Sequence, residues 1–297
     1  MEAMAKNIES KKTPVLAVLN MKGGVGKTTI AANVMRLLYK QFSKRTILVD
    51  FDPQFNLTQL LYTQDKYEKL KNEKRTILSI MESEPETSLF KVTSASTPPP
   101  KLSEVSVTVK RLQDSVADLR LVPGDFGLVK YSLIEDPKTL TPVKERFKTF
   151  IKEAKEDSDL VCIDCNPSSS FMTVCALEAA THVLVPVRPD RFSILGLELL
   201  DTFVNDLHTL KVKPKFIVVL NDIPRNNYDP TVENQLRAHP NFGKKTLSTP
   251  LYYSRVLTAS HSYTGFATDK KGSYVGRATA NVQKLARELG IELGLDK

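Results

Sequence analysis

Short runs of apolar, often β-branched residues alternate along this chain with stretches whose apolar residues recur every three to four positions. The first pattern is typical of buried strands and the second predicts amphipathic helices. Strands are predicted at residues 14–20 (PVLAVLN), 46–50 (TILVD), 119–123 (LRLVP), 160–164 (LVCID), 183–187 (VLVPV) and 216–221 (FIVVLN), and helices at 28–40 and 143–155. This alternation predicts one α/β domain over residues 1–297, built as a doubly wound, mainly parallel sheet flanked by helices.

One segment, from about residue 84 to 115, breaks this pattern. It is enriched in Ser and Thr, contains the run Pro98–Pro100 and shows little helical periodicity. We expect a loop insertion here, either a surface for a partner or simply tolerated extra length. The second alternative is favoured, because surface loops accept insertions at a low free-energy cost.

The length and composition are typical of a globular protein with a buried core. At 297 residues and 41% hydrophobic, the chain can bury a sizeable core. It has no apolar run near the roughly 20 residues that span a bilayer, and its first residues lack the apolar stretch of a signal peptide. We therefore expect a cytoplasmic protein. Cys162 and Cys165 flank Asp164 and are expected to be packing residues, since no second ligand pair stands at zinc spacing.

The segment 22–29 (KGGVGKTT) carries the most specific chemistry, because it resembles the phosphate-loop pattern G-x-x-x-x-G-K-[ST] between a predicted strand and a predicted helix. Its glycines would let backbone N–H groups surround a phosphate chain at the positive end of the helix. Lys27 would reach the β- and γ-phosphates, and the Thr28 hydroxyl would ligate magnesium. The predicted nucleotide-binding residues are Gly23, Gly24, Val25, Gly26, Lys27, Thr28 and Thr29.

The second lysine of this segment, Lys22, is either a solvated charge or a functional group. KGGVGKTT is similar to the deviant Walker A motif of the ParA/MinD family of dimeric ATPases. The resemblance implies ATP and Mg²⁺ as ligands and a sandwich homodimer. It also implies that Lys22 reaches the partner's nucleotide, in the way an arginine finger acts elsewhere.

Two further segments extend the resemblance. Residues 50–58 (DFDPQFNLT) are similar to the family's D-x-D-P-Q-x-N-x-T, which implies that Asp52 positions the attacking water and that Asp50 lies near the magnesium shell. The strand at 160–164 ends in Asp164 as a Walker B strand does, so Asp164 would hold magnesium through water. Asn166 and Phe55 depart from the family pattern, which puts the shape of two loops in doubt.

The match continues downstream. Residues 183–196 resemble the strand and loop after Walker B in ParA proteins, and 216–221 resemble the strand whose terminal polar residue helps to recognise the base. This makes Asn221 a candidate for contact with adenine. The alternative is an ordinary polar residue at the end of an apolar strand.

The positive charge of the chain is uneven. Residues 211–297 contain fourteen Lys or Arg and seven Asp or Glu, so this last third carries seven of the formal +8 charges. Such an excess favours a face that meets a polyanion, although a solvated basic surface without a partner is the alternative. The candidates for DNA contact are Lys244, Lys245, Arg255, Lys270, Lys271, Arg277, Lys284 and Arg287.

Residues 249–257 resemble the ParA stretch I-P-x-x-x-R-L, with Arg255 at the arginine position. The resemblance implies non-specific DNA binding by the ATP-bound homodimer and a ParB-like partner that accelerates hydrolysis. Few residues precede the first strand, so we expect no helix-turn-helix domain and no specific operator binding.

The resemblance therefore implies a weak, switch-like ATPase that is nucleoid-associated and segregates or positions plasmid DNA, chromosomal DNA or another cargo. Two alternatives stay open. A MinD-like membrane ATPase is disfavoured because the tail at 285–297 contains two glycines and no aromatic residue, which makes a poor membrane anchor. An ATP-dependent biosynthetic enzyme on the same fold would need a small-molecule pocket beside the γ-phosphate.

Overall fold

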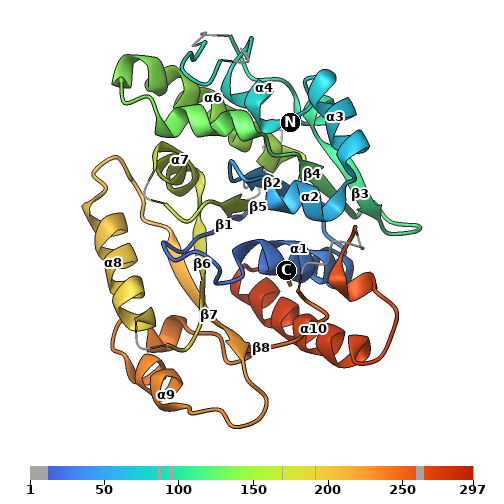
Figure 1. Cartoon of the computed structure of the whole chain (residues 1–297), viewed down its shortest axis with the longest axis vertical. Helices are drawn as coiled ribbons and strands as arrows, with labels where there is room; N and C mark the ends of the chain where they lie inside the picture. The colour runs from blue at the N-terminus through green and yellow to red at the C-terminus, as the bar shows by residue number, and fades with distance from the viewer. Residues whose placement is uncertain are drawn as a thin grey trace, which may run out of the picture.

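The computed structural model describes residues 13–85, 88–93, 97–168, 170–190, 192–258 and 264–296. Its strands form one eight-stranded sheet in the order β3-β4-β2-β5-β1-β6-β7-β8 (Figure 1). Neighbouring strands are parallel except β3 and β4, which confirms the predicted mainly parallel sheet. The strands are β1 (Val15–Val18), β2 (Thr46–Phe51), β3 (Val107–Arg111), β4 (Asp118–Val122), β5 (Leu160–Cys165), β6 (His182–Val187), β7 (Lys215–Ile223) and β8 (Leu251–Tyr252).

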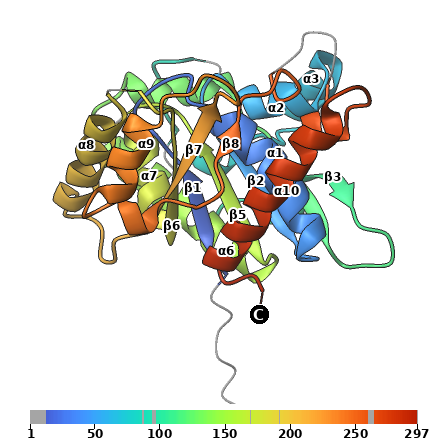
Figure 2. The ribbon, with the colours of Figure 1, turned by 90° about the horizontal axis from the view of Figure 1, so that it is seen from below.

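Helices cover both faces of this sheet (Figure 2). The α-helices are α1 (Lys27–Gln41), α2 (Asn56–Leu61), α3 (Gln64–Asn72), α4 (Ile77–Met81), α5 (Leu102–Val105), α6 (Pro137–Glu156), α7 (Phe171–Ala179), α8 (Ser193–Asp206), α9 (Thr231–Ala238) and α10 (Val275–Glu292). Three short 3₁₀ helices are η1 (Phe126–Ser132), η2 (Gly243–Lys245) and η3 (Ala267–Asp269).

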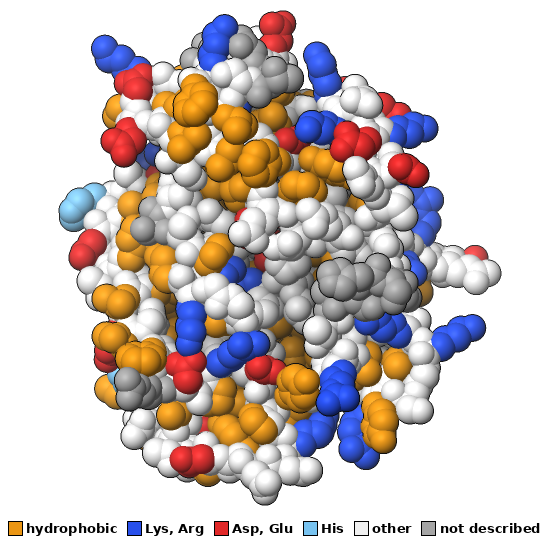
Figure 3. Space-filling view, viewed as in Figure 1, with side chains coloured by type: hydrophobic (Ala, Val, Ile, Leu, Met, Phe, Trp, Pro, Cys, Tyr) orange, Lys and Arg blue, Asp and Glu red, His pale blue; other side chains and the backbone are white. Residues whose placement is uncertain are grey.

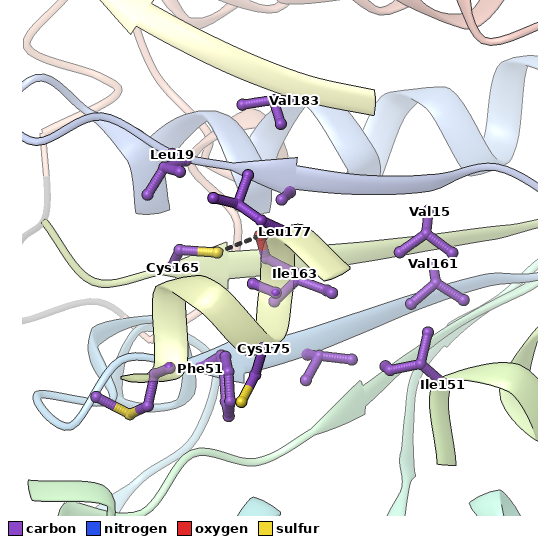
Figure 4. Close-up of a cluster of buried hydrophobic side chains, with 14 of the residues drawn as sticks. Val15, Leu19, Phe51, Ile151, Val161, Ile163, Cys165, Cys175, Leu177 and Val183 are labelled. Atoms are coloured by element: carbon purple, nitrogen blue, oxygen red, sulfur yellow. Dashed lines mark hydrogen bonds between the residues drawn. The ribbon is translucent and has the colours of Figure 1, made fainter. Parts of the chain in front are cut away.

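The central strand β1 shows why helices pack on both faces of the sheet. Val15 and Ala17 belong to a core with α4, α6, α7 and α8, whereas Leu16 and Val18 belong to a second core with α1, α2 and α10. Successive side chains of a strand point to opposite faces, so an uninterrupted apolar strand needs a helical layer on each side. The first core includes Cys165, whose thiol donates to the Ile163 carbonyl at 3.6 Å (Figure 4). The three cysteines are free and buried, in agreement with the packing role expected for Cys162 and Cys165.

The expectation of an irregular loop at 84–115 is wrong for residues 102–111, which form α5 and β3. Strand β3 pairs antiparallel with β4 at the edge of the sheet. It is only partly buried, so its apolar pattern is weak and does not indicate a strand. Residues 86–87 and 94–96 of the segment lie outside the described part of the chain.

The backbone after α4 is tied to the core through one buried carboxylate. Glu82 accepts hydrogen bonds from the Tyr131 hydroxyl at 2.7 Å and from the backbone N–H and hydroxyl of Thr93 at 2.8 and 2.9 Å. The same carboxylate forms an ion pair of 3.1 Å with Lys130, and both of these side chains are completely buried. The start of the segment expected to be a loop is therefore fixed from inside the protein.

The last helix, α10, packs its apolar side against α1. Leu285 and Leu289 are buried, and Gly290 lets the helix approach Phe42 closely, since a Cβ at position 290 would lie 2.2 Å from that ring. The leucines at the end of the chain, including Leu293 and Leu295, are thus used in the core, whereas Ile291 is 50% exposed. Within the described ranges, no helix is both long enough and apolar enough to cross a bilayer.

Candidate nucleotide site and adjoining basic groove

A hollow of about 580 Å³ lies at the carboxyl ends of the central strands, where open α/β sheets bind their ligands. It is lined by Gly23, Gly24, Gly26, Lys27, Thr28, Thr29, Asp52, Gln54, Asn56, Pro167, Arg188, Asn221, Asp222, Leu251, Tyr252, Tyr253, Ser254, Leu257 and Thr258. The predicted phosphate loop, Asp52 and Asn221 therefore share one cavity. Val25 is the exception, because its side chain is buried in the protein and does not face the hollow.

The loop between β1 and α1 has the backbone that phosphate binding requires. Gly24 and Gly26 have φ angles of 71° and 88°, a left-handed region that favours glycine. Gly26 precedes the first residue of α1, so the N-terminal N–H groups of that helix face the hollow. Met21 stands at the first glycine position of G-x-x-x-x-G-K-[ST], so the loop matches that general pattern only from Gly26 onward.

Asn221, two residues before the end of β7, braces this loop. Its side-chain N–H donates to the Val25 carbonyl at 2.7 Å, and a Cβ at Gly26 would lie only 2.4 Å from the same amide nitrogen. Asn221 is 8% exposed. The structure thus gives this residue a supporting role in the loop, and its contact with adenine stays a prediction.

Lys27 lies across the loop with its ammonium group inside it. The Nζ atom donates to the carbonyls of Asn20 and Lys22, both at 3.3 Å. Burial lowers the pKa of Lys27, and the negative charges of Asp164 and Asp52 oppose that change. A γ-phosphate would supply the counter-charge that two neutral carbonyls do not.

Two carboxylates meet next to the loop because β2 and β5 are parallel neighbours in which Asp50 pairs with Asp164. Burial raises the pKa of Asp50 to about 7, although the Thr58 hydroxyl and backbone N–H, at 2.6 and 2.8 Å from Oδ2, lower it. Burial, followed by the charge of Asp50, raises the pKa of Asp164 well above its usual range, while the nearby Thr28 hydroxyl acts in the opposite direction.

These two groups fit a divalent cation. Oδ1 of Asp50 and both carboxylate oxygens of Asp164 are buried and lack a hydrogen-bond partner of normal geometry. Among the residues described, no group of three or more His, Cys, Asp or Glu side chains is arranged to hold a metal alone. Mg²⁺ commonly takes one or two carboxylates and completes its shell with phosphate oxygens and water. The donor set of Asp50, Asp164 and Thr28 matches that requirement.

Asp52 lies at the surface of the hollow and is 8% exposed. Burial raises its pKa, while a hydrogen bond from the Gln54 N–H, at 2.9 Å, and the charge of Lys27 lower it. The next turn contains Phe55 with a φ angle of 40°, a left-handed region that favours glycine. The Phe55 ring stacks on Tyr67 with centroids 4.8 Å apart, an interaction that offsets the backbone strain.

Lys22 is on the rim and is held by its own chain. Its ammonium group donates to Asp190, in the turn before α8, and the two side chains are 48% and 38% exposed. Partial burial acts to raise the pKa of Asp190, but hydrogen bonds from Lys22, the Phe192 N–H and Ser193 outweigh it and lower the pKa. An exposed ion pair of this kind contributes about 0–1 kcal/mol, so Lys22 can leave it easily.

A second hollow, which we call the basic groove, adjoins the first and has a volume of about 720 Å³. It shares Tyr253, Ser254 and Thr258 with the nucleotide hollow. The basic groove is lined by Arg225, Tyr253, Ser254, Arg255, Val256, Thr258, Lys270, Lys271, Ser273, Tyr274, Val275, Arg277 and Ala278. Lys and Arg side chains gather on this part of the face shown in Figure 3, between β8 and the start of α10.

The structure brings together only part of the predicted basic set. Arg255, Lys270, Lys271 and Arg277 line the basic groove. Lys244 and Lys245 instead line a hollow that includes Lys215, the first residue of β7, and so lie toward the opposite ends of the parallel strands. Lys284 is exposed on α10 and lines neither the nucleotide hollow nor the basic groove. Charge counted along the sequence could not separate these surfaces.

Sequence reasoning missed three contributors to the site. Asp190 pairs with Lys22, which lies 168 residues earlier in the chain. The Thr58 hydroxyl donates to Asp50 and accepts a hydrogen bond from the Gly124 N–H at 2.8 Å, so it connects the two. Arg225 lines the basic groove although it stood in no predicted basic cluster. Thr58 and Asp190 lie in segments that resemble the family, but the sequence assigned them no role, because each acts through a contact that folding creates.

The fold and the strand-end site define a phosphate-loop nucleotide-binding protein of the α/β class. A family model described as an AAA domain matches residues 13–217, and the chain belongs to that family. Within it, the chain is a member of the ParA group, in agreement with the predicted family.

Two relatives illustrate the match. Sporulation initiation inhibitor protein Soj of Bacillus subtilis is 30% identical over 63% of this chain and 64% of its own length. A putative replication protein A of Rhizobium rhizogenes is 27% identical over 80% of this chain. The match spans only 57% of the length of the Rhizobium protein.

Solved structures share the fold at low identity. A putative plasmid partition protein of Borrelia burgdorferi bound to AMPPNP has a TM-score of 0.63 at 19% identity, covering 93% of this chain and 98% of its own. The pNOB8 ParA bound to nonspecific DNA has a TM-score of 0.64 at 16%, covering 96% and 100%. Cobyrinic acid a,c-diamide synthase of Mycobacterium smegmatis, with an ATP analogue and magnesium, reaches 0.66 at 22%, covering 93% and 94%.

Proposed function

We propose that this protein is a switch ATPase that binds Mg-ATP, dimerises, hydrolyses ATP slowly and binds DNA non-specifically in its ATP-bound form. The observation that carries the proposal is that the nucleotide hollow and the basic groove share a wall formed by Tyr253, Ser254 and Thr258. A nucleotide and a polyanion would therefore contact the same short segment. The ATP-analogue and DNA complexes of the ParA-like structures support both ligand classes.

In the nucleotide hollow, Lys27 and the backbone of the glycine loop would hold the phosphates. Asp50, Asp164 and Thr28 would hold Mg²⁺, which neutralises phosphate charge when bound. Asp52 is the carboxylate at the surface of the hollow, and it would orient a water for attack on the γ-phosphate. Asp52→Ala should retain ATP binding while phosphate release falls, and unchanged turnover would remove Asp52 from the mechanism.

Dimerisation would depend on Lys22. Because Lys22 is exposed on the rim, it can leave Asp190 and bind the phosphates of the nucleotide held by a partner subunit, which carry more charge than one carboxylate. In light scattering with Mg-AMPPNP, Lys22→Ala should remain a monomer, with the nucleotide affinity of the monomer retained. A dimer that persists in this variant would contradict the role across the interface.

The output would be segregation or positioning of DNA or another cargo on the nucleoid, inside the cytoplasm, with a ParB-like partner that stimulates turnover. Arg255, Lys270, Lys271 and Arg277 would meet DNA phosphates from the basic groove. The apolar side of α10 packs against α1 and is not free to enter a membrane, which argues against the MinD-like alternative.

The decisive experiment measures binding of a random-sequence duplex with ATP, ADP or no nucleotide, at two salt concentrations. We expect salt-sensitive binding only with ATP, because phosphate contacts release counterions. Arg255→Ala should weaken this binding, and Lys211→Ala, an exposed cation before β7 and outside the groove, serves as the matched control. Absence of binding in every state would contradict the DNA-binding part, and phosphate release that requires a small substrate would favour a biosynthetic enzyme.

A further inference from the structure

Cations alone do not account for the basic groove, because two of its side chains are exposed aromatic rings. Tyr253 is 52% exposed and Tyr274 is 76% exposed, and both line the groove among Arg255, Lys271 and Arg277. Binding of duplex phosphates requires positive charge and hydrogen-bond donors but no ring faces. The two tyrosines therefore indicate a second kind of contact.

Tyr274 is held in an unfavourable backbone conformation. Its φ angle is 68°, and it directly precedes α10 without capping that helix through its side chain. A left-handed conformation costs a residue other than glycine about 1–2 kcal/mol. Glycines stand two positions away on each side, at 272 and 276, but position 274 itself carries an aromatic ring. Strain that is kept at an exposed residue in a groove points to a functional use of that residue.

Tyr253 is positioned by the sheet. Its backbone N–H donates to the Ile223 carbonyl at 2.9 Å, which continues the pairing of β7 with β8 by one residue. The preceding residue, Tyr252, has its ring under the Arg225 guanidinium at 4.5 Å. One tyrosine thus follows a strand end that is hydrogen-bonded to the sheet, and the other directly precedes a long helix; both line the basic groove.

We propose that the basic groove binds a single strand of DNA, with phosphates on Arg255, Lys271 and Arg277 and unpaired bases stacked on Tyr274 and Tyr253. The inference rests on the proposed function in taking this groove as the DNA-binding surface. Positive grooves with exposed aromatic rings are the usual arrangement for single strands, because every base has a face on which a ring can stack. In a duplex those faces are covered by neighbouring base pairs, so ring stacking adds nothing to its affinity, and only a tyrosine hydroxyl could contact its phosphates.

The test is fluorescence anisotropy with a labelled 20-nucleotide single strand of mixed sequence and with the matching duplex, both with Mg-AMPPNP. We expect Tyr274→Ala to lower the affinity for the single strand roughly tenfold, the range of one lost base stack, and to leave duplex affinity unchanged. Tyr274→Phe should retain wild-type affinity for both. Phe90→Ala removes an exposed ring outside the groove and is the matched control.

A glycine variant separates this role from folding. Tyr274→Gly relieves the left-handed strain, so its urea midpoint should equal or exceed that of the wild type while its affinity for the single strand falls as in Tyr274→Ala. Lys271→Ala should instead weaken binding of both DNA forms and reduce the salt dependence of each.

Two outcomes would overturn the inference: equal losses for single strand and duplex in Tyr274→Ala, or no loss for either. If Lys271→Ala and Arg255→Ala leave both DNA forms bound as before, the DNA-binding surface of the proposed function fails instead. The two ideas therefore fail in distinguishable ways.

Discussion

Removal of the Asn221 side chain tests how the phosphate loop is held in place. In Asn221→Ala the donor to the Val25 carbonyl at 2.7 Å is lost, in a site where Asn221 is 8% exposed. A buried polar group left without its partner costs about 1–3 kcal/mol. The variant also leaves a space beside Gly26. In the wild type the side-chain nitrogen of Asn221 occupies that space, only 2.4 Å from where a Cβ on residue 26 would lie.

If the loop becomes disordered in the free variant, this free energy must be spent on ordering it when nucleotide binds, and the Kd for nucleotide rises about 5- to 150-fold. The loop contacts phosphates and not the base, so ATP and GTP should lose affinity by the same factor. Calorimetric titration with the Mg complexes of non-hydrolysable ATP and GTP analogues measures both values. Asn226→Ala, an exposed asparagine in the following turn, is the matched control and should bind as the wild type does.

Two results would refute this account. A loss confined to ATP would show that Asn221 recognises adenine, as its place near the end of β7 suggests. Unchanged affinity for both nucleotides would show that the loop keeps its conformation without the brace. The urea midpoint of each variant, measured without nucleotide, separates loss of the loop from general unfolding.

Three further changes test the packing that supports the site. Glu82→Ala leaves the completely buried Lys130 without its carboxylate and should lower the free energy of unfolding, measured by denaturant titration, by about 3–5 kcal/mol. The double variant Glu82→Ala/Lys130→Met should recover part of this loss, and a loss below about 1 kcal/mol in Glu82→Ala would contradict a buried ion pair. Phe55→Gly removes the left-handed strain but also the stack on Tyr67, so its free energy of unfolding should stay within about 1 kcal/mol of the wild type. Phe55→Ala loses the stack but keeps the strain, so it should be the less stable of the two variants in the same assay. Gly290→Ala should destabilise by about 1–3 kcal/mol because its methyl group meets the Phe42 ring, and the companion Phe42→Leu should restore part of the loss; a neutral Gly290→Ala would show that α10 can move away from α1.

The sequence by itself determined the sheet class and the chemistry of the loop. Buried parallel strands are continuous apolar runs, and each of the six predicted runs became a strand within a few residues of its predicted bounds. Lys27, Thr28, Asp50, Asp52 and Asp164 could be found because each stands next to such a run or to the glycine loop. Parallel strands place their carboxyl ends at one edge of the sheet, so residues far apart in the chain were expected to meet there.

Only the tertiary structure decided which of these groups touch. The register of β2 against β5 pairs Asp50 with Asp164. Burial raises the pKa of both carboxyl groups, and the charge of Asp50 raises that of Asp164 further. The edge strand β3 was missed because it is half-exposed and its apolar pattern is weak. Likewise, the Lys22–Asp190 pair and the split of the basic residues between two hollows depend on how distant segments pack. Composition and periodicity report burial of local segments, whereas contacts of this kind arise from the sheet order and from the helices that cover it.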